Sequence, residues 1–332
     1  MISIVVINWN GKKFLRECLE SLRIQTCQDV EIIAIDNAST DGSQEWLRQE
    51  PLDRLFLNAE NLGYCGGANQ GIAHARGEFI LIINPDVILE ADFLGRLSAC
   101  AEQHSEVGIF SGKLLRFDRK TLDSTGQFLR KNLTPFERGY DEEDRGQYEQ
   151  AGYVFSSCGA VALYRRAMLE QIRLDSGYFD ADYFAFYEDL DIGWRAQLFG
   201  WKAYYLPEAV AYHFRGGGLS EQSRPLSWFE RIPWIPRVSF TQKPYFIQRH
   251  IIKNRYLTML KNASWRVLFA GLPQILRLEC LILGYMLFVR PSLFRAFWEV
   301  IQLLPGTWRK RRHIQRRQAI PASEVLQYIR EA

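Results

Sequence analysis

Short apolar runs alternate with amphipathic stretches along the first 110 residues of this 332-residue chain. The apolar runs, at residues 4–7, 31–35, 55–57 and 79–83, are typical of strands buried on both faces of a parallel sheet. Stretches with helical spacing or a helix-capping start separate them, at residues 13–25, 41–49 and 67–76. Strand–helix alternation with short connections predicts an α/β fold with a doubly wound sheet.

Polar and small residues follow each of these predicted strands. In doubly wound sheets ligands bind at the carboxyl ends of the strands, so residues at those ends are candidates for a binding site. The candidates are Asn8 and Asn10 after the first strand, Asp36 after the second, Asn61, Gly63, Gly67 and Asn69 after the third, and Asn84 and Asp86 after the fourth. Any one of these ends could be an ordinary turn, but four together favour a ligand site.

Asp86 follows the fourth strand and Pro85, which restricts the backbone at the edge of the expected cleft. A Mg²⁺ or Mn²⁺ ion in such a cleft takes one or two protein carboxylates and completes its shell with phosphate oxygens. His213, which ends a later short strand, is the candidate second ligand, and Arg215 beside it could bind a diphosphate. An ordinary core or surface histidine is the alternative. The glycines at 216–218 indicate a flexible loop.

Glu188 and Asp189 begin a predicted helix that follows the aromatic run 183–187. Acids at the start of a helix are favoured by its dipole, so a simple helix cap would explain them. The aromatic residues, however, predict a partly desolvated space suited to a sugar ring, where a carboxylate can act as general base on an acceptor hydroxyl. Both acids are therefore candidate catalytic residues.

Six segments of the chain, in their order, resemble the motifs of the family-2 inverting glycosyltransferases of the GT-A type, and within them the bacterial rhamnosyltransferase-like branch. These segments are residues 5–10, 36–43, 61–64, 84–86 and 188–191, and His213. The resemblance extends over about residues 2–215. It implies a Rossmann-like mixed sheet with flanking helices, and a hexosyltransferase that uses a nucleotide-diphosphate donor.

The resemblance also implies roles at the nucleotide end of the site. Asp36 corresponds to the acid that contacts the base or ribose, and Asn8 and Asn10 lie where the family's first loop meets the nucleotide. The remaining matched residues of the donor site, in the third loop and the helix after it, are Asn61, Gly63, Gly67 and Asn69.

The metal and catalytic roles are implied in the same way. Asp86 corresponds to the last acid of the family's Asp-x-Asp metal motif, whose first position is Asn84 in this chain. One carboxylate therefore remains for a Mg²⁺ or Mn²⁺ cofactor, which makes His213 more important as a ligand. Asp189 corresponds to the catalytic base and Glu188 to its acidic neighbour. These roles imply a metal-assisted single displacement with inversion.

The rhamnosyltransferase-like branch implies dTDP-rhamnose as the donor, with a UDP-sugar as the alternative. It implies a growing bacterial cell-wall polysaccharide or a lipid-linked glycan as the acceptor.

Three other functions compete with this hypothesis. A dinucleotide-dependent oxidoreductase would need GxGxxG after the first strand, where Asn-Trp-Asn-Gly stands instead. A nucleotidyltransferase would carry a basic, glycine-rich loop at that place. A catalytically inactive, membrane-peripheral scaffold that binds nucleotide sugars would have lost its acids, and the acids of this chain are present.

The C-terminal part of the chain differs in composition. Residues 249–332 contain 15 Lys/Arg and 4 Asp/Glu, a net charge of +11, whereas the preceding 248 residues carry −8. The stretch 267–289 is apolar except for Arg277 and Glu279, which leaves open whether it spans a bilayer or lies on it. Apolar and aromatic residues beside a basic cluster favour an anionic membrane surface over nucleic acid. An ordinary helical subdomain or an oligomer interface is the alternative.

We therefore expect three parts in the chain and a membrane-peripheral location. The parts are a nucleotide-binding half at about 1–110 and an acceptor-binding half at 111–220, which together form the catalytic domain 1–220, and a helical, basic, membrane-associating extension at 221–332. Residues 117–152 predict a loop-rich excursion, and 154–164 predict a further buried strand. The six cysteines form no CxxC pair and no signal-peptide pattern begins the chain, so we expect reduced thiols in the cytoplasm, at the inner face of the bacterial plasma membrane.

Overall fold

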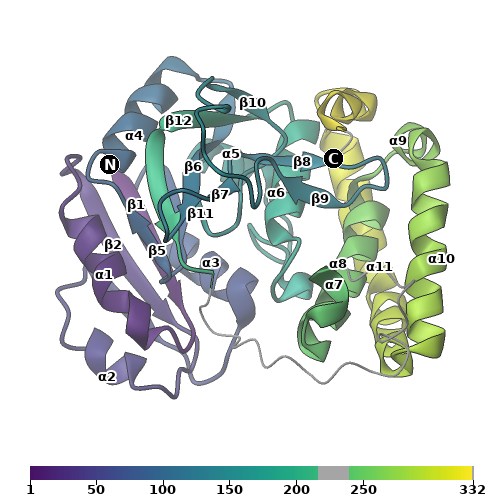
Figure 1. Ribbon diagram of the computed structural model, residues 1–332, viewed down its shortest axis with the longest axis horizontal. Helices are drawn as coiled ribbons and strands as arrows, with labels where there is room; N and C mark the ends of the chain where they lie inside the picture. Colours follow the sequence, from purple (N-terminus) through teal and green to yellow (C-terminus); the bar gives the residue numbers. More distant parts are fainter. Residues whose placement is uncertain (216–238, 331–332) are drawn as a thin grey trace.

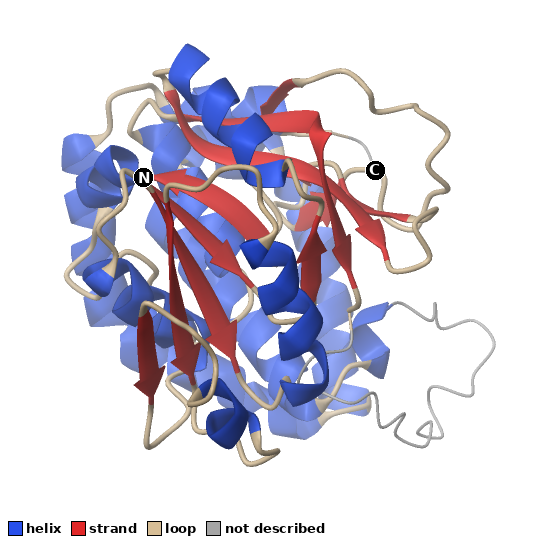
Figure 2. Ribbon diagram, turned by 90° about the vertical axis from the view of Figure 1, so that its left-hand side faces the viewer, coloured by secondary structure: helices blue, strands red, loops and turns tan. Residues whose placement is uncertain are grey.

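The computed structural model describes residues 1–215 and 239–330, so the glycines at 216–218 lie outside the described residues. Its centre is a ten-stranded mixed sheet with helices on both faces (Figures 1 and 2). In spatial order the main strands are β10 (Gly152–Val154), β12 (Lys202–His213), β6 (Val107–Arg116), β11 (Val161–Arg165), β4 (Phe79–Ile83), β1 (Ile2–Asn8), β2 (Val30–Asp36) and β3 (Arg54–Leu57). The short strands β5 (Val87–Leu89) and β7 (Leu122–Ser124) pair with β12 and β6, and β8 (Gln127–Leu129) and β9 (Pro135–Glu137) form a separate hairpin.

The part of the sheet around β1 is parallel. β1 pairs in parallel with β2 on one side and with β4 on the other, and β2 pairs with β3. β11 runs antiparallel between β4 and β6, which makes the sheet mixed. Because side chains alternate along β1, Ile4 and Val6 enter the core on one face of the sheet and Val5 and Ile7 enter the core on the other. Burial on both faces is the reason why this strand reads as a continuous apolar run.

Helices cover both faces of the sheet. On the face of Ile4 lie α1 (Lys12–Arg23), α2 (Ser43–Leu47) and α4 (Phe93–Gln103), and on the face of Val5 lie α3 (Gly63–His74), α5 (Arg166–Ile172) and α6 (Glu188–Leu198). The helical spacing predicted for α1 is confirmed, since Leu15, Cys18 and Leu22 are buried against the sheet.

The strand predicted over 154–164 is wrong in its first half. Pairing with β4 and β6 begins only at Val161, and β10 ends at Val154. The residues between them leave the sheet to contact the start of α6, where the hydroxyl of Ser156 donates to the backbone carbonyl of Asp189 (2.7 Å). The strand was predicted from the local apolar character of these residues. In the structure their contact with the start of the distant helix α6 determines their conformation instead.

The C-terminal part is helical in the described residues, as predicted. Its elements are α7 (Ser239–Gln242), α8 (Tyr245–Asn262), α9 (Trp265–Ala270), α10 (Leu272–Phe288) and α11 (Phe294–Arg317), followed by the 3₁₀ helix η4 (Ala322–Tyr328). α8 packs against α6 and α11, and Leu257, Val267 and Ile314 belong to the apolar core that includes the sheet. No helix within the described ranges is both long and apolar enough for a membrane span. The domain boundary at residue 220 stays a prediction.

A cluster of buried charges fastens the C-terminal helices to α6. Lys261 of α8 contacts Asp180 (2.5 Å) and Asp191 (2.9 Å), and Lys310 of α11 also contacts Asp180 (2.5 Å). Arg195 adds an ion pair with Asp191 (2.9 Å). Burial opposes the ionisation of Asp180, but the two lysines outweigh it and hold the pKa of this carboxyl below its ordinary value. Such buried charges are compatible with a stable fold only while their oppositely charged partners are present.

Replacing Lys261 by methionine should destabilise the protein, because Asp180 and Asp191 lose a shared cation and stay buried. We expect Lys261→Met to lower the free energy of unfolding by roughly 3–5 kcal/mol, measured by urea denaturation. The exposed pair of Arg48 and Glu45 offers a control, since Arg48→Met should change the same quantity by less than about 1 kcal/mol. Equal effects of the two substitutions would contradict a special role of the buried cluster.

Candidate active site

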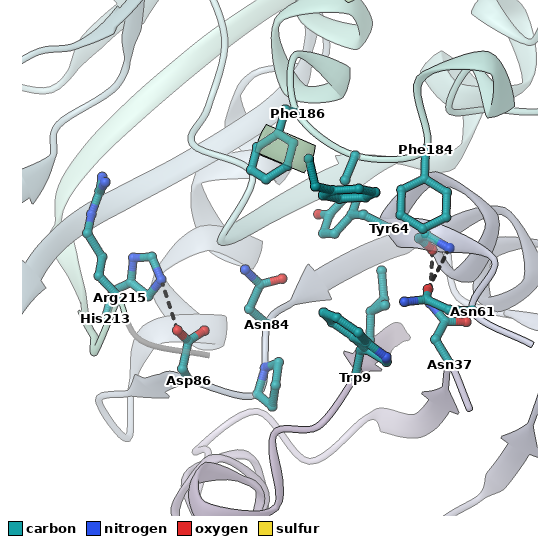
Figure 3. A pocket seen from close by; sticks show the side chains of 15 residues that line it. Trp9, Asn37, Asn61, Tyr64, Asn84, Asp86, Phe184, Phe186, His213 and Arg215 are labelled. Carbon is teal, nitrogen blue, oxygen red and sulfur yellow. Dashed lines mark hydrogen bonds and ion pairs between the residues drawn. The ribbon is translucent and has the colours of Figure 1, made fainter. Parts of the chain in front are cut away.

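The ends of β1, β2 and β4 meet the start of α3 and the loop before α6 at a cavity of about 460 Å³ (Figure 3). The predicted site residues that line it are Asn61, Gly63, Asn84, Asp86, His213 and Arg215. Trp9, Asn37 and Tyr64, to which no role was assigned from the sequence, line it as well, and so do Phe184 and Phe186 of the aromatic run 183–187 that was predicted beside the site. In Figure 3 the two phenylalanines lie across the cavity from Trp9 and Asp86. The cavity therefore combines polar strand ends with an aromatic wall.

Asn37 and Gly63 shape one end of this cavity. The side-chain amide of Asn37 donates to the carbonyl of Gly63 (2.9 Å), whose own amide donates to the side chain of Asn61 (2.8 Å). Gly63 has a φ of 72°, and a Cβ there would lie 2.5 Å from the carbonyl oxygen of Phe184. Only glycine fits this close approach. Together with the indole of Trp9, these planar polar groups suit a nucleotide base.

Asp36, Asn8 and Asn10 do not line the cavity. The fully buried carboxylate of Asp36 accepts hydrogen bonds from three protein groups, among them the side chain of Asn8 (2.7 Å). Asn8 and Asp36 are register partners in neighbouring parallel strands, so they lie on the same face of the sheet. Asn8 and Asp36 support the loops that carry Trp9 and Asn37. Asn10 joins the same two loops through hydrogen bonds. Their contact with a nucleotide stays a prediction.

Gly67 and Asn69 also lie outside the cavity lining, on α3. A Cβ at Gly67 would lie 2.9 Å from Cγ2 of Ile7, so the glycine lets this helix pack closely on β1. The side chain of Asn69 donates to the carbonyl of Phe179 (2.8 Å) and accepts from its amide (2.9 Å). Both residues thus position other parts of the site, and their contact with the nucleotide stays a prediction.

The structure brings Asp86 and His213 together, with Oδ2 of Asp86 3.5 Å from Nε2 of His213 (Figure 3). Behind them, the fully buried Asp123 of β7 binds Nδ1 of His213 (2.8 Å) with one oxygen and Nε of Arg215 with the other. Burial alone would lower the pKa of His213, but the hydrogen bonds and charges of Asp123 and Asp86 outweigh it and raise the pKa to about 9. One carboxylate therefore orients both the imidazole of His213 and the guanidinium of Arg215.

This arrangement fits a divalent cation. The facing atoms belong to one carboxylate and one imidazole, which can share a Mg²⁺ or Mn²⁺ ion with phosphate oxygens. A hydrogen bond from the second ring nitrogen to a carboxylate, here that of Asp123, is the usual support of a histidine ligand. Over residues 1–215 and 239–330, no three His, Cys, Asp or Glu side chains are arranged to hold a metal. The further ligands would come from the donor diphosphate and water.

A second cavity of about 550 Å³ adjoins the first. The two share Tyr64, Asn84, Ala185, Phe186, His213 and Arg215 in their linings. Glu188 and Asp189 line the second cavity, and so do Gln127 and Glu137, which were not predicted. The donor-side and acid-bearing residues therefore face one continuous space.

The three acids of the second cavity differ in their surroundings. One oxygen of Asp189 accepts from Gln127 (3.1 Å) and from the amide of Gly159 (3.2 Å), and burial raises the pKa of this carboxyl. Burial and the charge of Asp189 raise the pKa of Glu188 to about 8 and that of Glu137 to about 7. Near neutral pH Glu188 therefore favours its protonated form, whereas Glu137 is divided between its protonated and ionised forms.

The loop between the 3₁₀ helix η1 (Ala181–Tyr183) and α6 carries backbone strain. Phe184, Phe186 and Tyr187 have φ angles of 67°, 71° and 71°, a left-handed conformation that costs a residue with a Cβ roughly 1–2 kcal/mol. The side-chain amide of Asn254 on α8 donates to the backbone carbonyls of Ala185 (2.8 Å) and Phe186 (2.7 Å) in this loop. The C-terminal helices therefore hold the aromatic wall of the site in place.

Residues 3–173, just over half of the chain, match the family described as Glycosyl transferase family 2. The chain is 25% identical over 232 residues to Glycosyltransferase GlyA of Streptococcus pneumoniae. This match covers 66% of this chain and 31% of that protein. It is 28% identical over 219 residues to the Putative glycosyltransferase EpsH of Bacillus subtilis, covering 64% and 60%. It is 27% identical over 243 residues to the N-acetylglucosaminyl-diphospho-decaprenol L-rhamnosyltransferase of Mycobacterium tuberculosis, covering 65% and 76%. The chain thus spans less than two thirds of the first two of these relatives.

Solved structures of low sequence identity share the fold. The S. aureus TarS 1-349 structure in complex with UDP-GlcNAc matches 91% of this chain and 80% of its own, with a TM-score of 0.58 and 18% identity. The structure of GalNAc-T7 with UDP, GalNAc and Mn²⁺ matches 79% of this chain and 48% of its own, with a TM-score of 0.57 and 12% identity. These likenesses confirm the predicted GT-A type mixed sheet with flanking helices.

Glu188 should make the stability of the protein depend on pH. Its pKa of about 8 in the folded state lies above that of an unfolded glutamate, so the folded state keeps a proton that the unfolded chain loses. This group therefore favours folding at low pH, and the advantage disappears as the pH rises to about 8. We expect Glu188→Gln to gain roughly 2–4 kcal/mol in unfolding free energy relative to wild type between pH 5 and pH 8, measured by urea denaturation.

The matched control is Glu17→Gln, at an exposed glutamate of α1. This variant should follow the wild type at both pH values. A difference between Glu188→Gln and wild type that is the same at pH 5 and pH 8 would refute the raised pKa.

Proposed function

The chain belongs to glycosyl transferase family 2 and is a glycosyltransferase, and on this premise we propose that it moves a sugar from a nucleotide-diphosphate donor to a glycan or lipid-linked glycan with inversion at the anomeric carbon. The observation that carries the proposal is the pair of adjoining cavities, in which the side chains of Asp86, His213 and Arg215 face the same space as Asp189.

We propose Asp189 as the catalytic base. Its carboxylate is fixed by the amides of Leu190 (2.8 Å) and Gly159 (3.2 Å) and by the side chain of Gln127 (3.1 Å). Asp189 takes the proton of the acceptor hydroxyl, and the oxygen forms a bond to the anomeric carbon as the bond from that carbon to the diphosphate oxygen breaks on the opposite face. The nucleoside diphosphate leaves with the bonding electron pair. Holding both substrates in this geometry supplies much of the catalysis.

On the donor side, Asp86 and His213 would hold the Mg²⁺ or Mn²⁺ ion, which when bound neutralises charge on the diphosphate. Arg215 would contribute a further cationic contact to the phosphates. Asn8, Asn10, Asp36, Asn61, Gly63, Gly67, Asn69 and Asn84 form or support the nucleotide end of the site. Glu188 stays beside the base and, in its protonated form, adds no second charge there.

We propose dTDP-rhamnose as the favoured donor, with UDP-sugars as the alternative. The similarity to the M. tuberculosis N-acetylglucosaminyl-diphospho-decaprenol L-rhamnosyltransferase supports rhamnose as the transferred sugar and a lipid-linked acceptor in bacterial polysaccharide or cell-wall synthesis. Such an acceptor is held in a membrane, so we also propose a peripheral location at the anionic inner face of the bacterial plasma membrane.

Removing the base should stop transfer and spare donor binding. We expect Asp189→Asn to lower kcat by roughly 10²–10⁴-fold, the usual contribution of a general base, in assays of nucleoside diphosphate release with dTDP-rhamnose and UDP-sugars. The affinity for dTDP and UDP, measured by calorimetry with Mn²⁺, should change little. Asp175→Asn, at an exposed aspartate outside both cavities, is the matched control. Wild-type turnover in Asp189→Asn would refute the base, and nucleotide binding without any turnover in the wild type would favour an inactive scaffold.

Asp123 should act on the metal through His213. Asp123→Asn keeps the size of the side chain and removes the charge that orients the imidazole, so we expect the affinity for Mn²⁺ with UDP to fall about 10–100-fold, measured by calorimetry or by the Mn²⁺ electron paramagnetic resonance signal. Asp118→Asn, at an exposed turn of the same segment, is the control. If His213→Ala lost Mn²⁺ binding while Asp123→Asn kept it, Asp123 would not position the ligand.

A further inference from the structure

Three consecutive C-terminal helices expose large apolar side chains. Trp265 of α9 is 69% exposed, Phe288 of α10 is 68% exposed and Trp298 of α11 is 60% exposed. Further exposed apolar residues of these helices include Phe269, Leu276, Leu281, Leu287, Ile301 and Trp308. We call the exposed residues of α9, α10 and α11 the C-terminal apolar face. Exposed apolar groups gathered on neighbouring elements mark an interaction surface.

The arrangement of α10 and α11 explains why these side chains are not core. Among the 17 residues of α10, only Ile275 and Met286 are buried. Figure 1 shows this helix at the outer edge of the molecule, with α8 and α11 between it and the sheet. On α11, Trp298, Ile301 and Trp308 recur at helical spacing. These side chains therefore lie at the surface of the C-terminal helices and not in the core.

The charge of the same helices is strongly positive. Residues 265–317 contain ten Lys/Arg and two Glu, a net charge of +8. The two acids are paired with arginines of α8, Glu279 with Arg255 (2.5 Å) and Glu299 with Arg249 (3.2 Å). The exposed side chains of Arg266, Arg277, Arg309 and Arg312 make no ion pair within the described part of the chain. Exposed positive charge thus lies on the same three helices as the exposed apolar side chains.

We propose that the C-terminal apolar face docks on the surface of an anionic lipid bilayer. Tryptophan, phenylalanine and leucine enter the boundary between head groups and acyl chains, while arginines beside them bind anionic head groups. A second copy of this chain fits less well, because a symmetric dimer through this face would bring two regions of charge +8 together. Nucleic acid would leave the apolar side chains without a partner.

This inference deepens the proposed function and rests on it only for the acceptor. α8 contributes Ile251 to the lining of the acid-bearing cavity and packs against α11. The docking face and the proposed acceptor site are thus joined through directly packed helices. A lipid-linked acceptor held in the same bilayer would reach the cavity while the enzyme stays docked.

The test is flotation of the full-length protein with vesicles of phosphatidylcholine, with and without phosphatidylglycerol. We expect binding that requires the anionic lipid and weakens as the salt concentration rises. Arg309→Ala and Arg312→Ala should each weaken it about fivefold, and Trp298→Ser by at least about tenfold. Ile24→Ser, at an exposed apolar residue of the nucleotide half, is the matched control and should bind like the wild type.

The thermal unfolding midpoint of each variant checks that it folds. Absence of binding to anionic vesicles, or equal binding by wild type and Trp298→Ser, would overturn the proposal. A dimer in solution that Trp298→Ser converts to monomer, without an effect on vesicles, would assign the face to a second copy instead. Vesicle binding is measured without substrate, so its failure is distinguishable from a failure of glycosyl transfer.

Discussion

The buried charges around Asp191 are the constraint on which the site depends. Asp191 follows the candidate base Asp189 by two residues on α6, and residues with this spacing point to different sides of a helix. Asp189 therefore reaches the acid-bearing cavity while Asp191 is buried against Lys261 and Arg195. One acidic motif thus supplies both a group for chemistry and the attachment that orients it. The position of the candidate base is thus set by charges that lie outside the linings of both cavities.

Buried carboxyl groups have shifted pKa values in both cavities, but the shifts have opposite directions. On the donor side, Asp123 is buried next to His213 and Arg215, and these cationic neighbours hold its pKa below the ordinary value although burial alone would raise it. On the other side, Glu137 and Glu188 have polar or acidic neighbours, so burial prevails and raises their pKa values. Similar desolvation therefore yields an ionised, oriented array in the first cavity and a weakly charged space in the second. The difference lies in which side chains the fold brings beside each acid.

The parallel half of the fold could be predicted from the sequence because strands buried on both faces read as apolar runs, and their ends gather at one edge. Asp86 was found in this way, and His213 was found at the end of a later short strand, beside Arg215. Asp123 and Glu137 were not found, because they lie in short hairpin strands of a segment without periodicity. Contacts with residues far along the chain, such as that of Asp123 with His213, bring this segment to the site. The register of β1 and β2 explains why Asn37 lines the cavity and Asp36 does not. Strand alternation is a local signal that could have separated these two neighbours.

The C-terminal helices link the candidate active site to the C-terminal apolar face. Asn254 of α8 holds the strained aromatic loop, and Lys261 of the same helix shares Asp180 with Lys310 of α11. Within the described residues, the apolar face of α11 and the wall of the active site are therefore fixed to each other by buried ion pairs. If the C-terminal apolar face were attached through a flexible linker, the distance between the cleft and a bilayer would not be fixed. In the proposed docking, a surface fixed in this way would set one height and one orientation of the cleft, and presenting a membrane-held hydroxyl to the candidate base Asp189 would require such a fixed geometry.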